Sequence, residues 1–343
     1  MNEQDERWMS RAIELALMGK GQVDPNPLVG CVIVHNNKII AEGFHRKFGE
    51  PHAEVNAVNS ITDTSLIPAS KVYVTLEPCA HHGKTPPCTD LLIKSGFKSV
   101  VVGSVDPNHK VAGKGIAKLR QAAIEVTVGV LKKNCEEINA FFFEAHLHKK
   151  PYYLLKWAQS QDGFIFNPSK KRQLSGTASQ QLVHELRSEY QGILIGKRTA
   201  INDNPSLTVR LHKGRTPIRM VVMHEWDVIL ENGKLFKDGF STLYFNTSKE
   251  GKLGNKEWIR IPPDKPWKTI NQILLSRGIN SVLVEGGTQI LTQLIEENWW
   301  NEIIRIDTKV LLEGGLAGPE FEGKIESVKI IGNDQWSRYI NMH

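Results

Sequence analysis

The sequence predicts an α/β protein made of two consecutive domains. Segments with helical and with strand-like patterns alternate along both halves of the chain, which is typical of layered sheets with parallel strands. The length of 343 residues is about twice the ~150 residues of a typical domain. A hydrophobic content of 40% with 23% charged residues is that of a globular protein and argues against a disordered chain.

The first half opens with an amphipathic helix, because apolar side chains between Trp8 and Leu17 recur at helical spacing. The apolar run Val29–Val34 predicts a strand, and Asn36-Asn37 predicts a tight turn into an antiparallel strand, Lys38–Ala41. The following elements are expected in this order: a helix from about His52, strand Lys71–Leu76, a helix from about Cys88, strand Ser99–Gly103, helix Gly113–Ala123 and strand Glu125–Val130.

A domain boundary is expected near Lys149-Lys150-Pro151, which divides the chain into residues 1–148 and 149–343. The second half starts again with a strand and alternates as the first half does, so we expect a second α/β domain. Its predicted elements are strand Tyr152–Ala158, helix Ser179–Tyr190, strands Gly192–Gly196, Ile218–Met223 and Thr242–Asn246, helix Trp267–Arg277, strand Ser281–Val284 and helix Thr288–Glu297, followed by closing strands. Segment Lys249–Lys268 is expected to be a surface loop.

The charge and composition of the chain indicate its cellular location and the kinds of partner it could bind. The chain has no apolar run near the ~18 residues that span a bilayer, and its acidic start, MNEQDERWMS, is unlike a signal peptide. We therefore expect a soluble, cytoplasmic protein. The net charge of +6 comes from 43 basic and 37 acidic residues, with neither half strongly basic. This balance suits a small phosphorylated substrate as well as a nucleic acid.

A possible zinc site is the sharpest functional signal. His52 follows a proline at the predicted start of a helix, Cys79 follows a strand, and Cys88 begins the next helix. A catalytic zinc takes three protein ligands and keeps its fourth position for water, whereas four protein ligands would indicate a closed structural site. Helix N-termini also stabilise thiolates. The sequence therefore predicts a catalytic Zn²⁺ held by His52, Cys79 and Cys88.

Glu54 makes this pattern more specific. It stands two residues after His52 in the first helical turn, where its carboxylate can reach the water without binding the metal and can pass the proton to a departing amine. The arrangement H-x-E…P-C is typical of zinc deaminases that act on cytosine-like or adenine-like rings. We predict that Glu54 is catalytic, and that the other two cysteines, Cys31 and Cys135, are core residues.

Polar residues near this pattern indicate the kind of substrate. The segment Ala80–Pro87 between the two cysteines is longer than in many deaminases and contains two histidines and Lys84, which suit a phosphate or an amino-substituted ring. Asn26, between two prolines, could contact a ring edge. Asp106 and Asn108 follow a predicted strand, at the edge where α/β sheets bind ligands.

Two strand–turn–helix junctions in the second half are typical of anion binding. They are Ile193–Thr199 and Val282–Thr288, the latter with a Gly-Gly turn. At such junctions backbone N–H groups point toward an anion. The chain contains no G-x-G-x-x-G fingerprint, so we do not expect a Rossmann dinucleotide domain.

The motifs of the first half are Pro25–Cys31, Gly43–His45, His52–Glu54, Thr75–Cys79, His81–Cys88 and Asp106–Asn108. Together they resemble the bifunctional riboflavin biosynthesis deaminase/reductase family. The resemblance implies a cytidine-deaminase-like α/β/α layered domain that hydrolytically removes the 2-amino group of 2,5-diamino-6-(5-phosphoribosylamino)pyrimidin-4-one. It also implies that Glu54 shuttles protons beside the zinc. The substrate-binding residues that it implies are Asn26, His45, Lys84, Asp106 and Asn108.

The resemblance continues through Lys156, Ser160–Gly163, Leu186-Arg187, Ile193–Gly196, Thr199, Asp203–Arg210 and Val284–Gly287. It implies a dihydrofolate-reductase-like domain that uses NADPH to reduce the ribosyl group of the deaminated product to ribityl, by hydride delivery to C1′. Asp203 is then catalytic, beside the reacting sugar and the cofactor. The other cofactor-binding residues are Ala158, Thr199 and Gly287, and the substrate-binding residues are Arg187, Leu207, Arg210 and Glu285. The two arginines suit a phosphate.

The chain departs from the family at one segment. Many members carry Ser-x-Trp before the first helix of this domain, with the serine on the substrate and the tryptophan on the cofactor. Here the segment reads Lys171-Arg172-Gln173-Leu174-Ser175, so neither role is carried over to it. At Asp203-Asn204-Pro205, where Asp-Asp-Pro is common in the family, the first acid is kept.

Two alternatives stay open on the sequence. One is a zinc deaminase that acts on RNA or free nucleosides, which would not explain the long segment between the cysteines or the second half. The other is a deaminase whose second half is a non-catalytic binding or assembly module, which Thr199, Asp203 and Arg210 together argue against. We expect a small phosphorylated pyrimidine substrate, no nucleic-acid or membrane partner, and a homo-oligomer.

Overall fold

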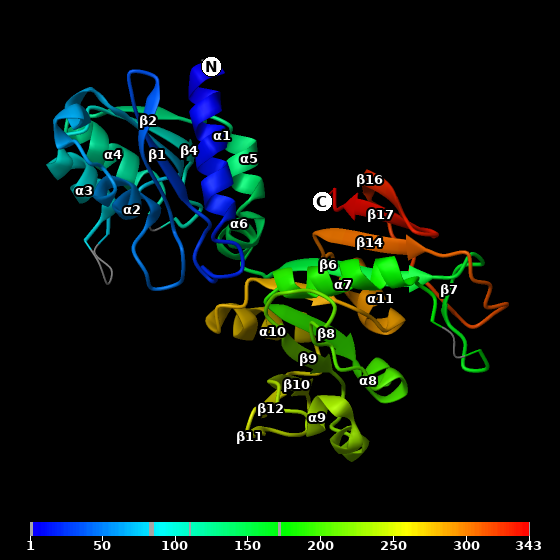
Figure 1. The fold of residues 1–343 in the computed structure, drawn as a ribbon. Helices are drawn as coiled ribbons and strands as arrows, with labels where there is room; N and C mark the ends of the chain where they lie inside the picture. Colours follow the sequence, from blue (N-terminus) through cyan, green and yellow to red (C-terminus); the bar gives the residue numbers. More distant parts are fainter. Residues whose placement is uncertain (1–2, 82–85, 110, 171–172, 343) are drawn as a thin grey trace. The chain divides into compact units, whose positions relative to one another are not determined.

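The computed structural model describes residues 3–81, 86–109, 111–170 and 173–342. The chain divides into two units, Met1–His148 and Lys149–His343, each built around its own main sheet (Figure 1). Among the described residues, no helix is long and apolar enough to cross a membrane.

The first unit alternates helices and strands as the sequence predicts. Asn36 and Asn37 both have positive φ, 45° and 62°, as a two-residue hairpin turn requires. The elements are α1 (Glu3–Leu17), β1 (Gly30–His35), β2 (Lys38–Phe44), α2 (Ala53–Asn59), the 3₁₀ helix η1 (Thr64–Ala69), β3 (Lys71–Leu76), α3 (Cys88–Ser95), β4 (Ser99–Ser104), α4 (Lys114–Gln121), β5 (Glu125–Val128), α5 (Lys132–Glu137) and α6 (Ala140–Leu147).

The first unit is a three-layered α/β/α sandwich. Its sheet has the order β2-β1-β3-β4-β5; the hairpin strands are antiparallel, and β3, β4 and β5 run parallel. Alternate residues of β1 point to opposite faces: Ile33 packs with α2, α3 and α4, and Val32 packs with α1 and α5. Cys31 and Cys135 are fully buried in these two cores, as predicted. The carboxyl ends of β3 and β4 lie side by side, so the loops that follow them meet.

The second unit contains more strands than the sequence analysis predicts. Its elements are β6 (Tyr152–Gln159), β7 (Phe164–Phe166), α7 (Thr177–Glu189), β8 (Gly192–Gly196), α8 (Lys197–Asp203), β9 (Ile218–Val222), η2 (Val228–Asn232), α9 (Lys234–Lys237), β10 (Thr242–Asn246), β11 (Gly251–Leu253), β12 (Lys256–Arg260), α10 (Pro266–Ser276), β13 (Ser281–Val284), α11 (Thr288–Glu296), β14 (Glu302–Asp307), β15 (Leu316–Ala317), β16 (Lys324–Ile331) and β17 (Asp334–Ile340).

A ten-stranded sheet forms the centre of the second unit, in the order β11-β12-β10-β9-β8-β13-β6-β14-β17-β16. The strands from β12 to β14 in this order run parallel, and antiparallel strands close both edges. Helices α10 and α11 pack against the main apolar core through Trp267, Ile270 and Leu291, which contact β6 and β13 residues such as Leu155 and Val284. Parallel strands again bring their carboxyl ends to one edge.

The prediction of a surface loop over Lys249–Lys268 is wrong. This segment holds β11, β12 and the start of α10, and β12 pairs in parallel with β10. The apolar pattern of β12 is interrupted in the sequence by Lys256, although this lysine is only 3% exposed in the structure. The ammonium group of Lys256 donates to the carbonyl oxygens of Asp238 and Phe240, at 2.8 and 2.7 Å. A lysine that is buried in this way looks like a surface residue in the sequence.

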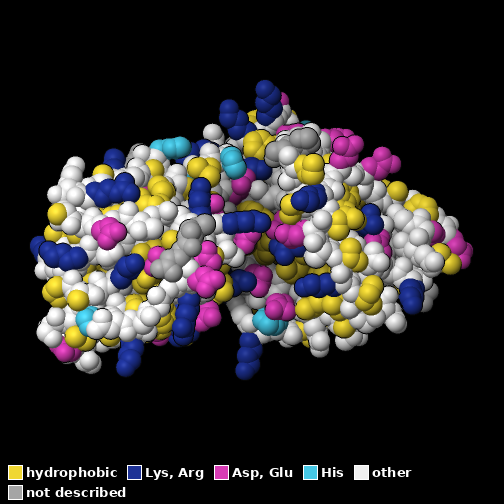
Figure 2. Space-filling model, turned by 90° about the horizontal axis from the view of Figure 1, so that it is seen from above, with side chains coloured by type: hydrophobic (Ala, Val, Ile, Leu, Met, Phe, Trp, Pro, Cys, Tyr) yellow, Lys and Arg dark blue, Asp and Glu magenta, His cyan; other side chains and the backbone are white. Residues whose placement is uncertain are grey.

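Charges of both signs are mixed on the face that Figure 2 shows. Lys and Arg side chains alternate there with Asp and Glu, and no large single-sign field stands out. Many of the acids are paired in the structure, as in the Arg277–Glu257 and Lys118–Asp90 ion pairs. The positive net charge is therefore dispersed on this face.

Replacing Trp258 by alanine should lower the free energy of unfolding of the second unit by about 3–5 kcal/mol, because a large buried side chain leaves a cavity. Trp258 is 5% exposed and stacks on Tyr244. Denaturant titration with tryptophan fluorescence measures the effect. The signal reports mainly on the second unit, because Trp8 is the only tryptophan of the first unit. Leu253→Ala on β11, where the side chain is 62% exposed, is the control. Equal effects of the two substitutions would contradict the assignment of β12 as a core strand.

Candidate active sites

Three potential metal ligands from distant parts of the sequence meet in the first unit. His52 is the N-cap residue of α2, Cys79 follows β3, and Cys88 is the first residue of α3. Their ligand atoms all lie within 4.8 Å of one another. His52 Nδ1 is 3.7 Å from Cys79 Sγ and 3.3 Å from Cys88 Sγ. These separations suit one ion at the ~2.0–2.3 Å bond lengths of zinc to nitrogen and sulfur.

The local chemistry favours a thiolate at this cluster. The Cys88 side chain, and after it His52 and the Cys88 backbone N–H, hydrogen-bond Cys79 and lower the pKa of its thiol, although burial opposes this. The N–H of Cys88, at the start of α3, donates to Cys79 Sγ at 3.3 Å. One imidazole nitrogen and two sulfurs form a donor set typical of zinc. The residues present therefore fit the predicted ion.

Glu54 lies in the first turn of α2 and is only 3% exposed. Burial raises the pKa of its carboxyl, and the nearby Cys79 adds to this effect. The carboxyl is close enough to Cys88 for a hydrogen bond. A buried carboxyl with a raised pKa beside a metal cluster has the properties of a group that takes up and releases a proton.

Asn26 and His45 lie together beside His52. The His45 ring is 3% exposed and lies edge-on to the His52 ring, with 5.6 Å between centroids. Burial lowers the pKa of His45, which favours the neutral ring. His45 Nδ1 lies 3.2 Å from the carbonyl oxygen of Pro51, which can only accept, so Nδ1 carries the proton. Nε2 then accepts from the Asn26 amide at 3.2 Å, and this fixes the orientation of the amide.

Asp106 and Asn108 follow β4, as predicted. The N–H of Asn108 donates to Asp106 Oδ1 at 2.8 Å, and burial raises the pKa of the Asp106 carboxyl. Lys84, the remaining predicted substrate residue of this unit, lies outside the described residues. The sequence analysis missed Glu77, a buried carboxylate between β3 and Cys79. A charged residue directly after an apolar strand and before Pro78 is the signal that could have found it.

The second unit has a cavity of about 1670 Å³ at the carboxyl ends of its central strands. Five of the predicted reductase residues line it. They are Ala158 at the end of β6, Thr199 and Asp203 on α8, and Glu285 and Gly287 in the turn between β13 and α11. Leu207, Arg187 and Arg210 are not among its lining residues.

The Gly-Gly turn is joined to α8 at the wall of this cavity. The N–H of Gly287 donates to Thr199 Oγ1 at 3.0 Å. Gly286 has a φ of 126°, which side-chain-bearing residues rarely adopt. Both predicted anion-binding junctions thus line one cavity. Its size and the glycine turn in its lining fit a dinucleotide such as NADPH, and Gln173, from the segment that departs from the family, also lines it.

Glu285 forms a buried ion-pair network. Arg187 donates to both of its carboxylate oxygens, at 2.6 and 2.7 Å, and Lys156 Nζ lies 3.4 Å from Oε2. Burial alone would raise the pKa of Glu285, but the charges of Lys156 and Arg187 outweigh it and lower the pKa to about 2. Lys156, which the sequence analysis assigned no role, also lines the cavity.

Arg187 and Arg210 are connected through Thr208. Arg187 donates to the Thr208 carbonyl oxygen at 3.4 Å, and Arg210 donates to Thr208 Oγ1 at 2.9 Å. Leu207, just before, is buried and has a φ of 54°. Arg187 therefore links Glu285 to Thr208, and Arg210 is bonded to the same threonine.

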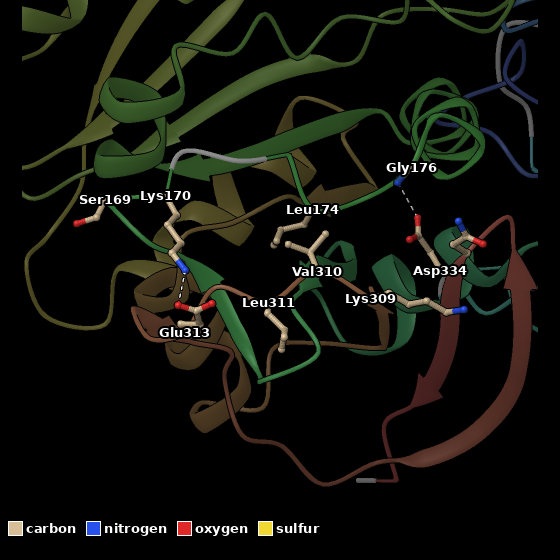
Figure 3. A pocket seen from close by; sticks show the side chains of 10 residues that line it. Ser169, Lys170, Leu174, Gly176, Lys309, Val310, Leu311, Glu313 and Asp334 are labelled. Atoms are coloured by element: carbon tan, nitrogen blue, oxygen red, sulfur yellow. Dashed lines mark hydrogen bonds and ion pairs between the residues drawn. The ribbon is translucent and has the colours of Figure 1, made fainter.

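A second cavity of the same unit, of about 930 Å³, lies between the start of α7 and the loops before β15 and β17 (Figure 3). Two pairs of polar groups meet in its lining: Lys170 with Glu313 at 2.7 Å, and Asp334 with the N–H of Gly176 at 2.8 Å. None of the predicted site residues lines it.

Comparisons with known proteins cover both units. A family model described as the RibD C-terminal domain matches residues 151–323. A model described as the cytidine and deoxycytidylate deaminase zinc-binding region matches residues 2–104. The riboflavin biosynthesis protein RibD of Aquifex aeolicus (strain VF5) is 38% identical over 350 residues, covering 97% of this chain and 98% of the relative. The chain belongs to the RibD family.

Other RibD proteins match over a similar length. The RibD of Actinobacillus pleuropneumoniae is 35% identical over 97% of this chain and 94% of its own. The solved structure of a diaminohydroxyphosphoribosylaminopyrimidine deaminase/5-amino-6-(5-phosphoribosylamino)uracil reductase from Thermotoga maritima has a TM-score of 0.87 and 35% identity, and covers 98% of this chain and 99% of that chain. The resemblance and the fold class predicted from the sequence are confirmed. The match of a RibD protein over its whole length also argues against a nucleoside or RNA deaminase.

Replacing Cys79 or Cys88 by serine should reduce bound zinc from about one ion per chain to nearly none, because serine is a poor zinc ligand. Elemental analysis of the purified chain measures the content. Cys31→Ser and Cys135→Ser are matched controls, since these buried thiols lie away from the cluster. Loss of zinc in a control, or its retention in both test variants, would contradict the proposed ligand set.

The Glu285 network should make a pH-dependent contribution to stability. Because the folded pKa of about 2 lies below the ordinary value of 4.5, the charged form stabilises the fold above pH 4.5, and the contribution is lost as the pH falls toward 2. At pH 7, Glu285→Gln should lower the free energy of unfolding by about 3–5 kcal/mol. The difference in free energy of unfolding between the wild type and Glu285→Gln should become smaller below pH 4.5. Urea titrations between pH 7 and 3.5 measure it.

A matched substitution separates this effect from the loss of an exposed charge. Glu313→Gln removes an ion pair with Lys170 whose acid is 71% exposed, and should cost less than about 1 kcal/mol. If the difference in free energy of unfolding between the wild type and Glu285→Gln stays constant down to pH 3.5, packing and not charge gives the stabilisation.

Proposed function

We propose that this chain is a bifunctional enzyme of riboflavin biosynthesis. Its first unit would deaminate 2,5-diamino-6-(5-phosphoribosylamino)pyrimidin-4(3H)-one, and its second unit would reduce the ribosyl group of the product to ribityl with NADPH. The observation that carries the proposal is that each unit has a candidate site, a metal-ligand cluster in the first and a cavity lined by five of the predicted residues in the second. Full-length matches to RibD proteins support it.

In the first unit, His52, Cys79 and Cys88 would hold Zn²⁺. A bound zinc ion supplies a Lewis acid that makes water a nucleophile near neutral pH. Glu54 takes the proton of the attacking water and returns it to the amine, so that ammonia leaves as a neutral molecule. Its burial suits this role, since a carboxyl with a raised pKa exchanges protons more readily near neutral pH.

Five residues of the first unit would bind the pyrimidine and its phosphoribosyl group. Asn26, whose amide nitrogen is engaged by His45, offers its oxygen to a ring N–H. Asp106 and Asn108 contribute from the loop after β4, and Lys84 suits the phosphate.

In the second unit, Ala158, Thr199, Asp203 and Gly287 would bind NADPH, which supplies the hydride. Hydride addition at C1′ also requires a proton on the sugar oxygen that is released, and Asp203 lies in the cavity wall where the sugar would react. Glu285, Arg187, Arg210 and Leu207 would contact or shape the substrate site. The arginines suit its phosphate.

This function is favoured over a deaminase with a non-catalytic second unit, because the second unit matches the RibD C-terminal domain and contains a cavity that predicted reductase residues line. The absence of a nucleic-acid partner and a homo-oligomeric state stay predictions.

Replacing Glu54 by glutamine should abolish deamination by at least about 10³-fold, since the variant cannot shuttle the proton. Release of ammonia measures the rate. Zinc content and the reductase rate of the same chain should match those of the wild type. A deaminase rate within tenfold of wild type would contradict the assigned role.

The reductase proposal is tested with the deaminated ribosylaminouracil phosphate and NADPH, by following nicotinamide absorbance. The wild-type chain should oxidise NADPH only when this substrate is present. Asp203→Asn should slow the reaction by about 10²-fold or more, with deamination unchanged. A wild-type preparation that deaminates but does not oxidise NADPH would support the binding-module alternative instead.

A further inference from the structure

Glu77 is a buried carboxylate whose partners connect two parts of the first unit. It follows β3 directly and precedes Pro78 and Cys79, and it is only 4% exposed. Its own N–H donates to the Ser104 carbonyl oxygen at 2.9 Å, which continues the pairing of β3 with β4. The side chain is thereby held at the point where the loops after the two strands meet.

The carboxylate accepts four backbone hydrogen bonds. Glu77 Oε2 accepts from the N–H groups of Asp106 and Gly113, at 3.2 and 2.9 Å. Oε1 accepts from those of Gly115 and Ile116, at 2.8 and 3.2 Å. In the part of the chain that the structure describes, no Lys or Arg forms an ion pair with Glu77. Its described partners are therefore backbone N–H dipoles, including those at the start of α4.

These bonds fix the loop that carries Asp106 and Asn108. The Asp106 N–H is bound to Glu77, and the Asp106 side chain in turn accepts from the Asn108 N–H. The Asn108 carbonyl oxygen accepts from the N–H of Val111 at 2.7 Å, just before the Gly113 N–H that Glu77 also binds. The described residues on both sides of this turn are thus organised around one carboxylate.

The same contacts hold the backbone next to a metal ligand. A Cβ on Gly115 would lie 2.1 Å from the Pro78 carbonyl oxygen, so the first turn of α4 packs directly on the peptide that leads into Cys79. If α4 moved away from Glu77, the Pro78 peptide would lose its packing contact, and the turn after β4 would lose its hydrogen bonds to the carboxylate.

We infer that Glu77 is a positioning residue of the deaminase, which sets the Asp106–Asn108 loop against the metal-ligand cluster without touching substrate or metal. The inference rests on the proposed deaminase function. The geometry supports the inference, because the one Glu77 carboxylate binds both the Asp106–Asn108 loop and the start of α4, the helix that packs beside Cys79. An uncharged side chain of the same shape cannot replace it: glutamine keeps one acceptor oxygen but turns an NH₂ group toward two N–H donors.

The test is Glu77→Gln in the full-length chain. We expect kcat/KM for deamination to fall about 10–100-fold, with most of the change in KM because the Asp106–Asn108 loop is displaced. Zinc content should stay at the wild-type value, since all three ligands are kept, and the reductase rate of the same preparation should be unchanged. Ammonia release, elemental analysis and NADPH oxidation measure these three quantities.

Glu136→Gln is the matched control. Glu136 accepts a hydrogen bond from Ser104 Oγ at 2.9 Å, so it is a carboxylate held at the end of β4 but without contacts to the Asp106 loop or α4 in the described hydrogen bonds. Its deamination constants should stay within twofold of wild type. If Glu77→Gln does not fold, Glu77→Asp, which keeps the charge on a shorter arm, should show the rise in KM at unchanged zinc content.

A Glu77 variant with a lower melting temperature but with kcat and KM per zinc-loaded chain within twofold of wild type would overturn the inference, because a purely structural role predicts that result. A wild-type chain without deaminase activity would refute the proposed function, and this inference with it. An active wild type beside an equally active Glu77 variant would refute only the role of Glu77.

Discussion

A charged carboxylate that is removed from water must find partners, and this constraint organises the site of each unit. Glu77 directly follows β3 and Glu285 directly follows β13, so each lies at the carboxyl end of a parallel strand. Leaving such a charge unpaired would cost several kcal/mol. The chain therefore arranges neighbouring segments as hydrogen-bond donors or cations around each carboxylate, and some of the candidate site residues, such as Asp106 and Gly287, lie in these segments.

The two units meet the constraint in different ways. Glu77 accepts hydrogen bonds from four backbone N–H groups, which orders a loop and a helix start, and among the described residues it forms no ion pair with a Lys or Arg. Glu285 is neutralised by Arg187 and Lys156, and Lys156 also lines the cavity of the second unit. The first arrangement suits a site whose positive charge would come from a metal ion. The second suits a phosphorylated substrate in the proposed reduction.

Much of the fold and of the first site could be predicted from the sequence. The residues at His52, Glu54, Cys79 and Cys88 carry their chemistry in their identity and spacing, and the strands of both sheets show as apolar runs. The prediction failed at Lys249–Lys268, because Lys256 is buried on backbone carbonyl oxygens and so conceals strand β12. It also passed over Glu77, because a glutamate that follows an apolar strand can be either buried or exposed, and only its partners across the fold show which.

The sequence by itself predicted the class of each unit, the metal-ligand set and the proton shuttle, because apolar periodicity and a recognisable pattern of residue types carry this information. Only the tertiary structure decided which groups lie together across long separations. Arg187 meets Glu285 across 98 residues and Gly115 meets Glu77 across 38. Such pairs depend on the order and register of the strands, which bring distant loops to one edge of a sheet, and no local pattern encodes that order.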